Sequence, residues 1–137
     1  MKKLIILLSL ILLTGCSETA IIKTGKISCE QKNIVLEDNN AVIIDVRTKE
    51  EYKEFHMDNA INIPYEKIID TLETKNEINK ETPIIVYCKS GTRSNKAYIS
   101  LINAGYKNVY DLGAISKWNV EIQSNLNFLI VKQNNIC

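Results

Sequence analysis

The chain has 137 residues, a formal net charge of +1 and 45% hydrophobic residues, which is enough for one domain with a sizeable core. Acidic and basic residues nearly balance and no long basic block stands out, so a nucleic-acid-binding protein is not expected. The sequence holds four cysteines without a C-x-x-C spacing and a single histidine, which argues against a metal site and implies no cofactor.

The first segment, residues 1–15, is expected to be a signal peptide. Two lysines precede ten mostly apolar residues, 4–13, and this run is too short to span a bilayer, which takes roughly 20 apolar residues. The sequence Leu-Thr-Gly-Cys ending at Cys16 resembles a bacterial lipobox, which implies that Cys16 carries a lipid such as palmitate. Residues 16–26 would then be a lipidated tether. An ordinary secretory signal is the alternative reading.

These features predict an exported protein that is anchored by lipid to the bacterial cell membrane, on its periplasmic or extracellular face. Loss of the signal would remove two of the 17 basic residues and leave all 16 acidic ones, giving a net charge of −1. The lipid is then the only membrane contact that the sequence implies.

Residues 27–137 are expected to form one domain in which strands and helices alternate. Strands are predicted at 41–46, 60–65, 84–88 and 108–112, and helices at 28–36, 48–56, 65–72 and 94–104, with a last helix after residue 113. Thr48 is a suitable N-cap, and Gly105 a suitable C-cap. Short apolar runs are typical of parallel strands that are buried on both faces. The alternation predicts an α/β fold, a parallel sheet with helices on both faces.

Cys88 ends the strongest of these strands and is the candidate nucleophile. Ligands of open α/β sheets bind beyond the carboxyl ends of the strands, and a helix N-terminus follows here that would favour a thiolate. Gly91 lets the backbone bend, and Arg93 is a planar cation suited to an oxyanion. A structural, buried cysteine is the alternative, but a polar and charged run would not usually follow one. The candidate substrate-binding residues are Lys89, Ser90, Gly91, Thr92 and Arg93, with the two hydroxyl groups donating inward.

Three segments, 42–65, 84–94 and 108–118, resemble the signature segments of the rhodanese-like domain, in the order and with the separations typical of that family. The resemblance spans about residues 27–120. It implies a rhodanese-like fold in which Cys88 carries a transferred sulfur as a persulfide and residues 89–93 cradle it.

The resemblance extends to single residues outside the loop. Asp45 and Arg47 match a signature at the end of the first strand and are the expected supporting residues, whereas Glu51, Tyr52, His56 and Trp118 match other signature positions. The chain departs from the family at Phe55, Asn59 and Ala114, where glycine is common, and it lacks a proline soon after the tryptophan. These departures concern the pocket wall and the C-terminal packing.

Loop length distinguishes two reactions. Cys88 and Arg93 are separated by four residues, as in sulfurtransferases, whereas related phosphatases use a loop one residue longer to hold a tetrahedral phosphate. The sequence therefore favours sulfur transfer from a donor such as thiosulfate to cyanide or a thiol. A sulfur-binding or partner-docking module without turnover is the first alternative, and a phosphatase or arsenate reductase is less favoured.

Several other residues have structural readings. Asp45 is more typical of a residue that holds an arginine or caps a helix than of a reacting group. Arg47 and Glu51, four residues apart, are expected to form a local ion pair. His56 is expected to be a hydrogen-bonded structural residue, and Trp118 a core or pocket-wall residue.

Three cysteines, Cys29, Cys88 and Cys137, remain after Cys16. An exported protein meets oxidising conditions in many bacteria, and an odd number of thiols leaves at least one of them free or reactive. Cys29 and Cys137 are candidates for a disulfide, provided that the fold brings them within bridging distance.

Overall fold

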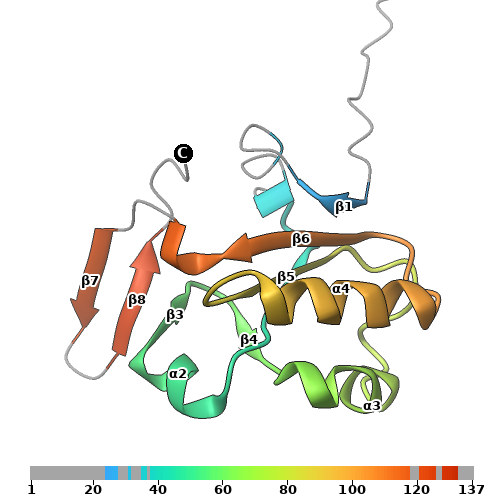
Figure 1. Ribbon diagram of the computed structural model, residues 1–137, viewed down its shortest axis with the longest axis horizontal. Helices are drawn as coiled ribbons and strands as arrows, with labels where there is room; N and C mark the ends of the chain where they lie inside the picture. Colours follow the sequence, from blue (N-terminus) through green and yellow to red (C-terminus); the bar gives the residue numbers. More distant parts are fainter. Residues whose placement is uncertain are drawn as a thin grey trace, which may run out of the picture.

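The structure, a computed structural model of the chain, describes residues 24–27, 31, 35–36, 38–117, 121–125 and 128–132, the last two ranges by their backbone alone. The elements are β1 (Gly25–Lys26), β2 (Val42–Asp45), α2 (Lys49–Glu54), β3 (Phe55–Met57), β4 (Ile61–Asn62), η1 (Tyr65–Lys67), α3 (Ile68–Glu73), β5 (Ile84–Cys88), α4 (Thr92–Asn103), β6 (Val109–Ala114), η2 (Ile115–Lys117), β7 (Glu121–Asn125) and β8 (Phe128–Lys132). Figure 1 shows their arrangement.

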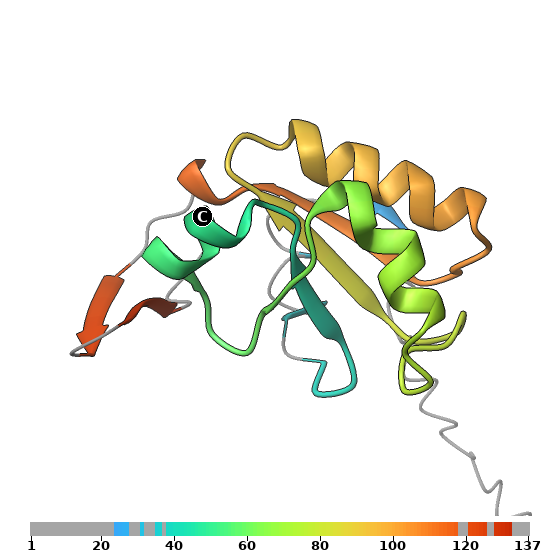
Figure 2. The same cartoon turned by 90° about the horizontal axis from the view of Figure 1, so that it is seen from below.

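The main sheet has five parallel strands in the order β1-β6-β5-β2-β4. All five residues of the central strand, β5, are buried, as its unbroken apolar run predicts. Helices α3 and α4 lie together on one face of this sheet (Figures 1 and 2). The predicted α/β fold, a parallel sheet with helices packed on it, is therefore confirmed.

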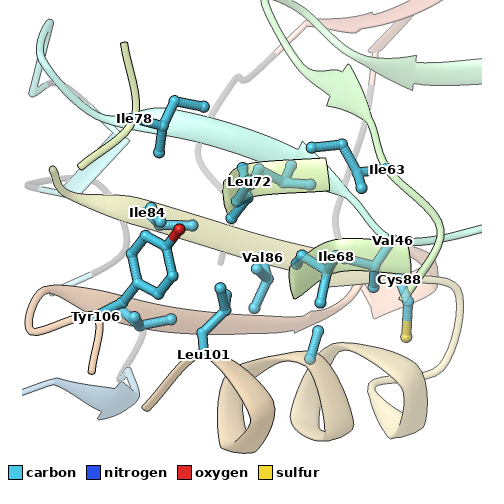
Figure 3. Close-up of a cluster of buried hydrophobic side chains, with 13 residues drawn as sticks. Val46, Ile63, Ile68, Leu72, Ile78, Ile84, Val86, Cys88, Leu101 and Tyr106 are labelled. Carbon is cyan, nitrogen blue, oxygen red and sulfur yellow. The ribbon is translucent and has the colours of Figure 1, made fainter. Parts of the chain in front are cut away.

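Side chains of β5 alternate between two hydrophobic clusters. Ile84, Val86 and Cys88 face α3 and α4, where they meet buried residues such as Leu72 and Leu101 (Figure 3). The intervening residues of β5 belong to a second cluster on the opposite face of the sheet. Cys88 ends the first row, and its sulfur points toward the loop that leads into α4 (Figure 3). Because side chains alternate between the two faces along a strand, the sulfur lies on the face of the sheet that α3 and α4 cover, and a reagent must reach it from that face.

Helix α2 begins as the sequence predicts and ends earlier. Thr48 is its N-cap in a reciprocal capping box with Glu51, in which each side chain bonds the other residue's backbone N–H. The helix was predicted to run to residue 56, but it stops at Glu54 because Phe55 takes an extended conformation and starts β3. Strand β3 pairs with β8 of a second sheet, a tertiary interaction that local helix signals do not reveal.

The last predicted helix is wrong. After β6 the chain makes one 3-10 turn, η2, and then an antiparallel pair, β7 and β8, which joins β3 in a three-stranded sheet. The sequence of β8, Phe-Leu-Ile-Val-Lys, is a contiguous apolar run with two β-branched residues, which favours a strand over a helix. Figure 1 shows this small sheet to one side of the main one.

Other boundaries shift by a few residues. The predicted strand 60–65 is only two residues long, Ile61–Asn62, because Pro64 opens η1. Helix α4 starts at Thr92, two residues before the predicted start, so the loop after Cys88 is shorter than expected. The helix predicted at 28–36 falls mostly outside the described residues. In the described ranges, no helix has both the length and the apolar character needed to cross a membrane.

Candidate active site

The sulfur of Cys88 lies under a short turn at the carboxyl end of β5. The residue is completely buried, and its Sγ accepts a hydrogen bond of 3.0 Å from the backbone N–H of Gly91. Gly91 is the N-cap of α4 and has φ +93°, a left-handed conformation that side chains other than glycine rarely adopt. The turn therefore directs the positive end of a peptide dipole at the atom that bears the charge of a thiolate.

The other loop residues divide into anchors and exposed groups. The carbonyl of Lys89 accepts hydrogen bonds from the backbone N–H and the Oγ of Ser116, at 3.5 and 2.9 Å, which fastens the loop to η2. Ser94 is buried, and its Oγ donates to the carbonyl of Gly91 at 3.1 Å. Sequence reasoning missed this second anchor, although a serine in the first turn of a helix is a usual backbone partner.

The side chains of Lys89, Ser90 and Thr92 are exposed. The sequence suggested that the two hydroxyl groups donate inward. Within the described residues, neither hydroxyl donates to Cys88, and both residues line a pocket beside the loop. Among the described residues, the donor in direct contact with Sγ is the backbone N–H of Gly91.

Arg93 is held by Glu51 in a two-point ion pair. Its two terminal nitrogens donate to the two carboxylate oxygens at 2.5 and 2.8 Å, and both side chains are about a quarter exposed, 27% for Arg93 and 24% for Glu51. The hydrogen bonds from Arg93 are the largest cause that lowers the pKa of Glu51 to about 2. The same bonds raise the pKa of Arg93. The guanidinium at the end of the loop is therefore neutralised and fixed in direction.

The ion pair expected between Arg47 and Glu51 does not form. Arg47 is 1% exposed and binds Asp45 instead, with its Nε 3.0 Å and its Nη2 2.7 Å from Oδ2. Nη2 also donates to the carbonyl of Phe55 at 2.5 Å, and the guanidinium lies 4.7 Å from the centre of the Phe55 ring. The local spacing favoured Glu51, but the buried carboxylate at the end of β2 offers Arg47 a closer, two-oxygen partner.

Asp45 and Arg47 therefore join β2 to β3 rather than touch the sulfur. Asp45 is completely buried and also accepts the backbone N–H of Arg47 at 2.9 Å. This geometry agrees with the reading of Asp45 as a residue that holds an arginine. A supporting role for the pair would act through the position of the β2 end, which lies next to β5 in the sheet.

His56 is a hydrogen-bonded residue of the scaffold. Its Nδ1 lies 2.8 Å from the carbonyl of Tyr52, and the two rings stack with their centres 3.8 Å apart. The Tyr52 hydroxyl donates to the carbonyl of Ala60 at 2.6 Å. Tyr52 and His56 therefore hold together the segment from α2 to β4. This arrangement agrees with the structural role expected for His56.

Four residues of the sequence interpretation, Cys16, Cys29, Trp118 and Cys137, lie outside the described residues. Among the described residues, Cys88 is a free thiol. The same part of the chain holds no group of three His, Cys, Asp or Glu side chains that could bind a metal ion.

Comparison with known proteins gives a consistent picture. A family model for the rhodanese-like domain matches residues 30–121. A tRNA uridine(34) hydroxylase from Photorhabdus laumondii is 35% identical over 92 residues, which are 64% of this chain and 26% of the relative. An adenylyltransferase and sulfurtransferase, uba4 from Ogataea parapolymorpha, is 40% identical over 86 residues, 61% of this chain and 21% of the relative. The chain therefore spans about a quarter of the length of these curated relatives.

A solved structure described as a rhodanese with anions from E. coli is 33% identical and superposes with a TM-score of 0.51. The match covers 55% of this chain and 87% of the other. The family match includes β5, the turn after Cys88 and α4. Because the family model covers well over half of the 137 residues, the chain belongs to the rhodanese-like domain family.

Proposed function

We propose that the chain is a sulfurtransferase that moves a sulfane sulfur through a persulfide on Cys88. The observation that carries the proposal is the contact between Sγ of Cys88 and the N–H of Gly91 at the start of α4. A thiol with an N–H donor at a helix N-terminus is set up to react as a thiolate. The sulfurtransferase named among the relatives supports the same reaction class.

The first half of the reaction charges the cysteine. The Cys88 thiolate attacks the outer sulfur of a donor such as thiosulfate, the sulfur–sulfur bond of the donor breaks, and sulfite leaves with the electron pair. The new outer sulfur is one bond beyond Sγ of Cys88, so we expect it next to the turn that begins α4, where the backbone N–H groups would stabilise its charge.

The second half discharges it. A nucleophilic acceptor, cyanide or a thiolate, attacks the outer sulfur, and Cys88 leaves as the thiolate with the electron pair of the broken bond. The enzyme returns to its starting state without a cofactor. Such a double displacement predicts ping-pong kinetics.

The proposal assigns different work to the two cations of the loop. Lys89 is exposed and, among the described residues, has no ion-pair partner, so it attracts the oxyanion end of thiosulfate. Arg93 gives two of its five N–H groups to Glu51 and keeps three for a bound anion or for the loop. Because Glu51 neutralises the charge of Arg93, this pair mainly orients the turn and adds little positive charge to the site.

Thiosulfate-to-cyanide transfer by the purified chain tests the proposal. The expected result is formation of thiocyanate with parallel lines in double-reciprocal plots, and its loss in Cys88→Ser. The matched control is Ser100→Ala, which alters an exposed hydroxyl of α4 outside the lining of the pocket beside the loop and should retain transfer. Full activity in Cys88→Ser would overturn the mechanism.

The complete burial of Cys88 favours a second candidate, a domain that holds a reactive sulfur or docks a partner without turnover. In that case the persulfide would form and persist in the presence of cyanide or thiols, and no donor would give multiple turnovers. Rapid hydrolysis of a phosphate ester would instead point to a phosphatase, which the four-residue spacing from Cys88 to Arg93 disfavours.

We also propose that the chain is exported and lipid-anchored at Cys16. This proposal rests on the sequence of residues 1–16 alone. Metabolic labelling of the expressed chain with a palmitate analogue should modify the wild type and leave Cys16→Ala unlabelled. Equal labelling of both chains, or labelling of neither, would overturn it.

A further inference from the structure

A pocket of about 360 Å³ opens beside the Cys88 turn, between the start of α4 and the carboxyl end of β6. Its wall includes Gly91 and Thr92 from the turn, Ala114 from β6 and Lys26 from β1. Figure 1 shows β1 running along β6, with α4 packed over the same region. The volume falls within the range of pockets that bind small molecules, about 300–1,000 Å³.

This pocket shares two residues with the immediate surroundings of the sulfur. Gly91 donates its N–H to Sγ of Cys88 and also lines the pocket. Ala114, which lines the pocket as well, is the register partner of Cys88 in the pairing of β5 with β6. A molecule bound in the pocket would therefore lie against the turn that holds the persulfide.

The wall contains a buried carboxylate with an unused oxygen. Asp111 is 2% exposed, and its Oδ1 accepts the backbone N–H of Gly113 at 2.9 Å. Within the described residues, Oδ2 receives no hydrogen bond and Asp111 has no ion-pair partner. A buried carboxylate without a full set of donors is unfavourable, and a ligand ammonium group is a donor that would satisfy it.

The rim of the same pocket is positive. Lys26 and Lys117 are exposed residues of the wall, and Thr92 and Asn95 bring the first turn of α4 to it. The N-cap, Gly91, has no side chain to bond the free N–H groups of that turn. Two lysines and a helix N-terminus form a favourable environment for a carboxylate.

We propose that this pocket binds the sulfur acceptor and that the acceptor is a zwitterionic aminothiol, a small thiol bearing both an ammonium and a carboxylate group, as cysteine does. The ammonium binds Asp111, and the carboxylate binds Lys26, Lys117 and the start of α4. The acceptor thiolate attacks the outer sulfur of the Cys88 persulfide, the bond between the two persulfide sulfurs breaks, and Cys88 leaves as the thiolate. The inference rests on the proposed sulfurtransferase function.

A series of acceptors tests each charge separately. Transfer from the thiosulfate-charged chain is measured with L-cysteine, cysteamine (no carboxylate), 3-mercaptopropionate (no ammonium) and 2-mercaptoethanol (neither group), each compared at equal thiolate concentration. The expected order of kcat/KM places L-cysteine first and 2-mercaptoethanol last, with a difference of about tenfold to a hundredfold, as charge-assisted hydrogen bonds provide. Equal values for all four thiols would overturn the proposal.

Two variants locate the effect. Asp111→Asn keeps an oxygen for the Gly113 N–H but loses the charge, and Lys117→Gln removes a rim cation. Each variant should lower the ratio of the L-cysteine rate to the cyanide rate about tenfold. Asp111→Asn should also reduce the advantage of L-cysteine over 3-mercaptopropionate, which has no ammonium group. Lys117→Gln should reduce its advantage over cysteamine, which has no carboxylate. Lys75→Gln, an exposed lysine outside the pocket lining, is the matched control and should leave the ratio unchanged.

A structural role for Asp111 gives a different result. Lys26 and Asp111 are register partners in neighbouring strands. The structural alternative is that Asp111 only stabilises the pairing of β1 with β6. In that case Asp111→Asn and Lys26→Gln would lower the melting temperature, reduce the cyanide and L-cysteine rates equally and leave the order of acceptors unchanged. This outcome would overturn the proposal while leaving the sulfurtransferase function intact.

Binding without turnover gives an independent measurement. S-methyl-L-cysteine has the same two charged groups and no thiol, and its addition should shift the backbone amide NMR signals of Asn95 and Gly113. Methyl 3-mercaptopropionate, which has neither charge, should not shift them. If S-methyl-L-cysteine shifts neither the Asn95 nor the Gly113 signal, the pocket proposal is contradicted even if transfer to cyanide proceeds. If it shifts both signals, the pocket proposal is supported even if transfer fails.

Discussion

Glu51 and Arg93 bind each other through both carboxylate oxygens and both terminal guanidinium nitrogens, although they are 42 positions apart in the sequence. Glu51 lies in the first turn of α2 and Arg93 in the first turn of α4. The pair therefore joins the start of one helix to the turn that holds the candidate nucleophile. Its effect on the molecule should be visible both in stability and in the behaviour of the loop.

Between neutral and acid pH, the free energy of unfolding should fall more in the wild-type chain than in Glu51→Gln. The folded pKa of Glu51, about 2, lies below its ordinary value of 4.5, because Arg93 favours the charged form. The stabilisation is therefore complete above about pH 4.5 and is lost as the pH falls toward 2. Urea unfolding across this window should give a steeper pH dependence for the wild type. Parallel profiles would show that the pair contributes nothing.

Loss of the buried Arg47 charge should lower the free energy of unfolding more than most other single substitutions. Arg47→Met leaves the Asp45 carboxylate completely buried without its cation, which costs about 3–5 kcal/mol in comparable buried pairs. The double variant Asp45→Leu with Arg47→Met removes both charges and should lose less stability than Arg47→Met alone. Urea unfolding measures both, and a double variant that is less stable than the single one would contradict the account.

Gly91→Ala should impair sulfur transfer beyond its effect on stability. A methyl group at Gly91 would meet its nearest neighbour, the backbone N of Ala114, at an ordinary 3.7 Å, so the cost comes from φ +93°. A left-handed residue with a side chain costs about 1–2 kcal/mol, and relaxation of that strain would turn the N–H away from Sγ of Cys88.

Gly105→Ala is the matched control for this prediction. Gly105 has φ +88°, follows the other end of α4 and has nothing within 4 Å of an added methyl group. Both variants should lower the melting temperature to a similar degree, but only Gly91→Ala should lower kcat for thiosulfate-to-cyanide transfer. Equal activity of the two variants would contradict the role of the Gly91 N–H.

Lys89→Gln should weaken thiosulfate binding with little effect on kcat. Lys89 is exposed and, among the described residues, is not in an ion pair, so it acts on the dianionic donor through solvent. KM should rise about threefold to tenfold at low ionic strength, and the difference from the wild type should shrink in salt. Lys75→Gln, exposed on another part of the surface, should leave KM unchanged. A loss confined to kcat would assign Lys89 to the chemical step instead.

Local patterns were sufficient for the core of the fold and for the position of the candidate nucleophile. The apolar run 84–88 predicted a buried strand, and Thr48 predicted the start of a helix, because both signals depend on neighbouring residues. The position of Cys88 at the end of that strand and before a helix followed directly from the same patterns.

Contacts between distant segments were not predictable in this way. Arg47 was assigned to Glu51 by helical spacing, but Glu51 binds Arg93, which is 42 positions away in the sequence. Arg47 binds Asp45, only two positions away, because both side chains are buried at the end of β2. Strand β8 was missed because it completes a sheet with β3, a segment that the sequence suggested was helical. The unused oxygen of Asp111 is also invisible in the sequence, since it depends on how β1, β6 and α4 meet.

The central claim is that Cys88 carries the transferred sulfur, and mass spectrometry of the thiosulfate-treated chain tests it most directly. The peptide that contains Cys88 should gain the mass of one sulfur atom, cyanide should remove this atom, and Cys88→Ser should show no gain. A Cys88 peptide of unchanged mass after treatment with thiosulfate and with other sulfane-sulfur donors would contradict the claim.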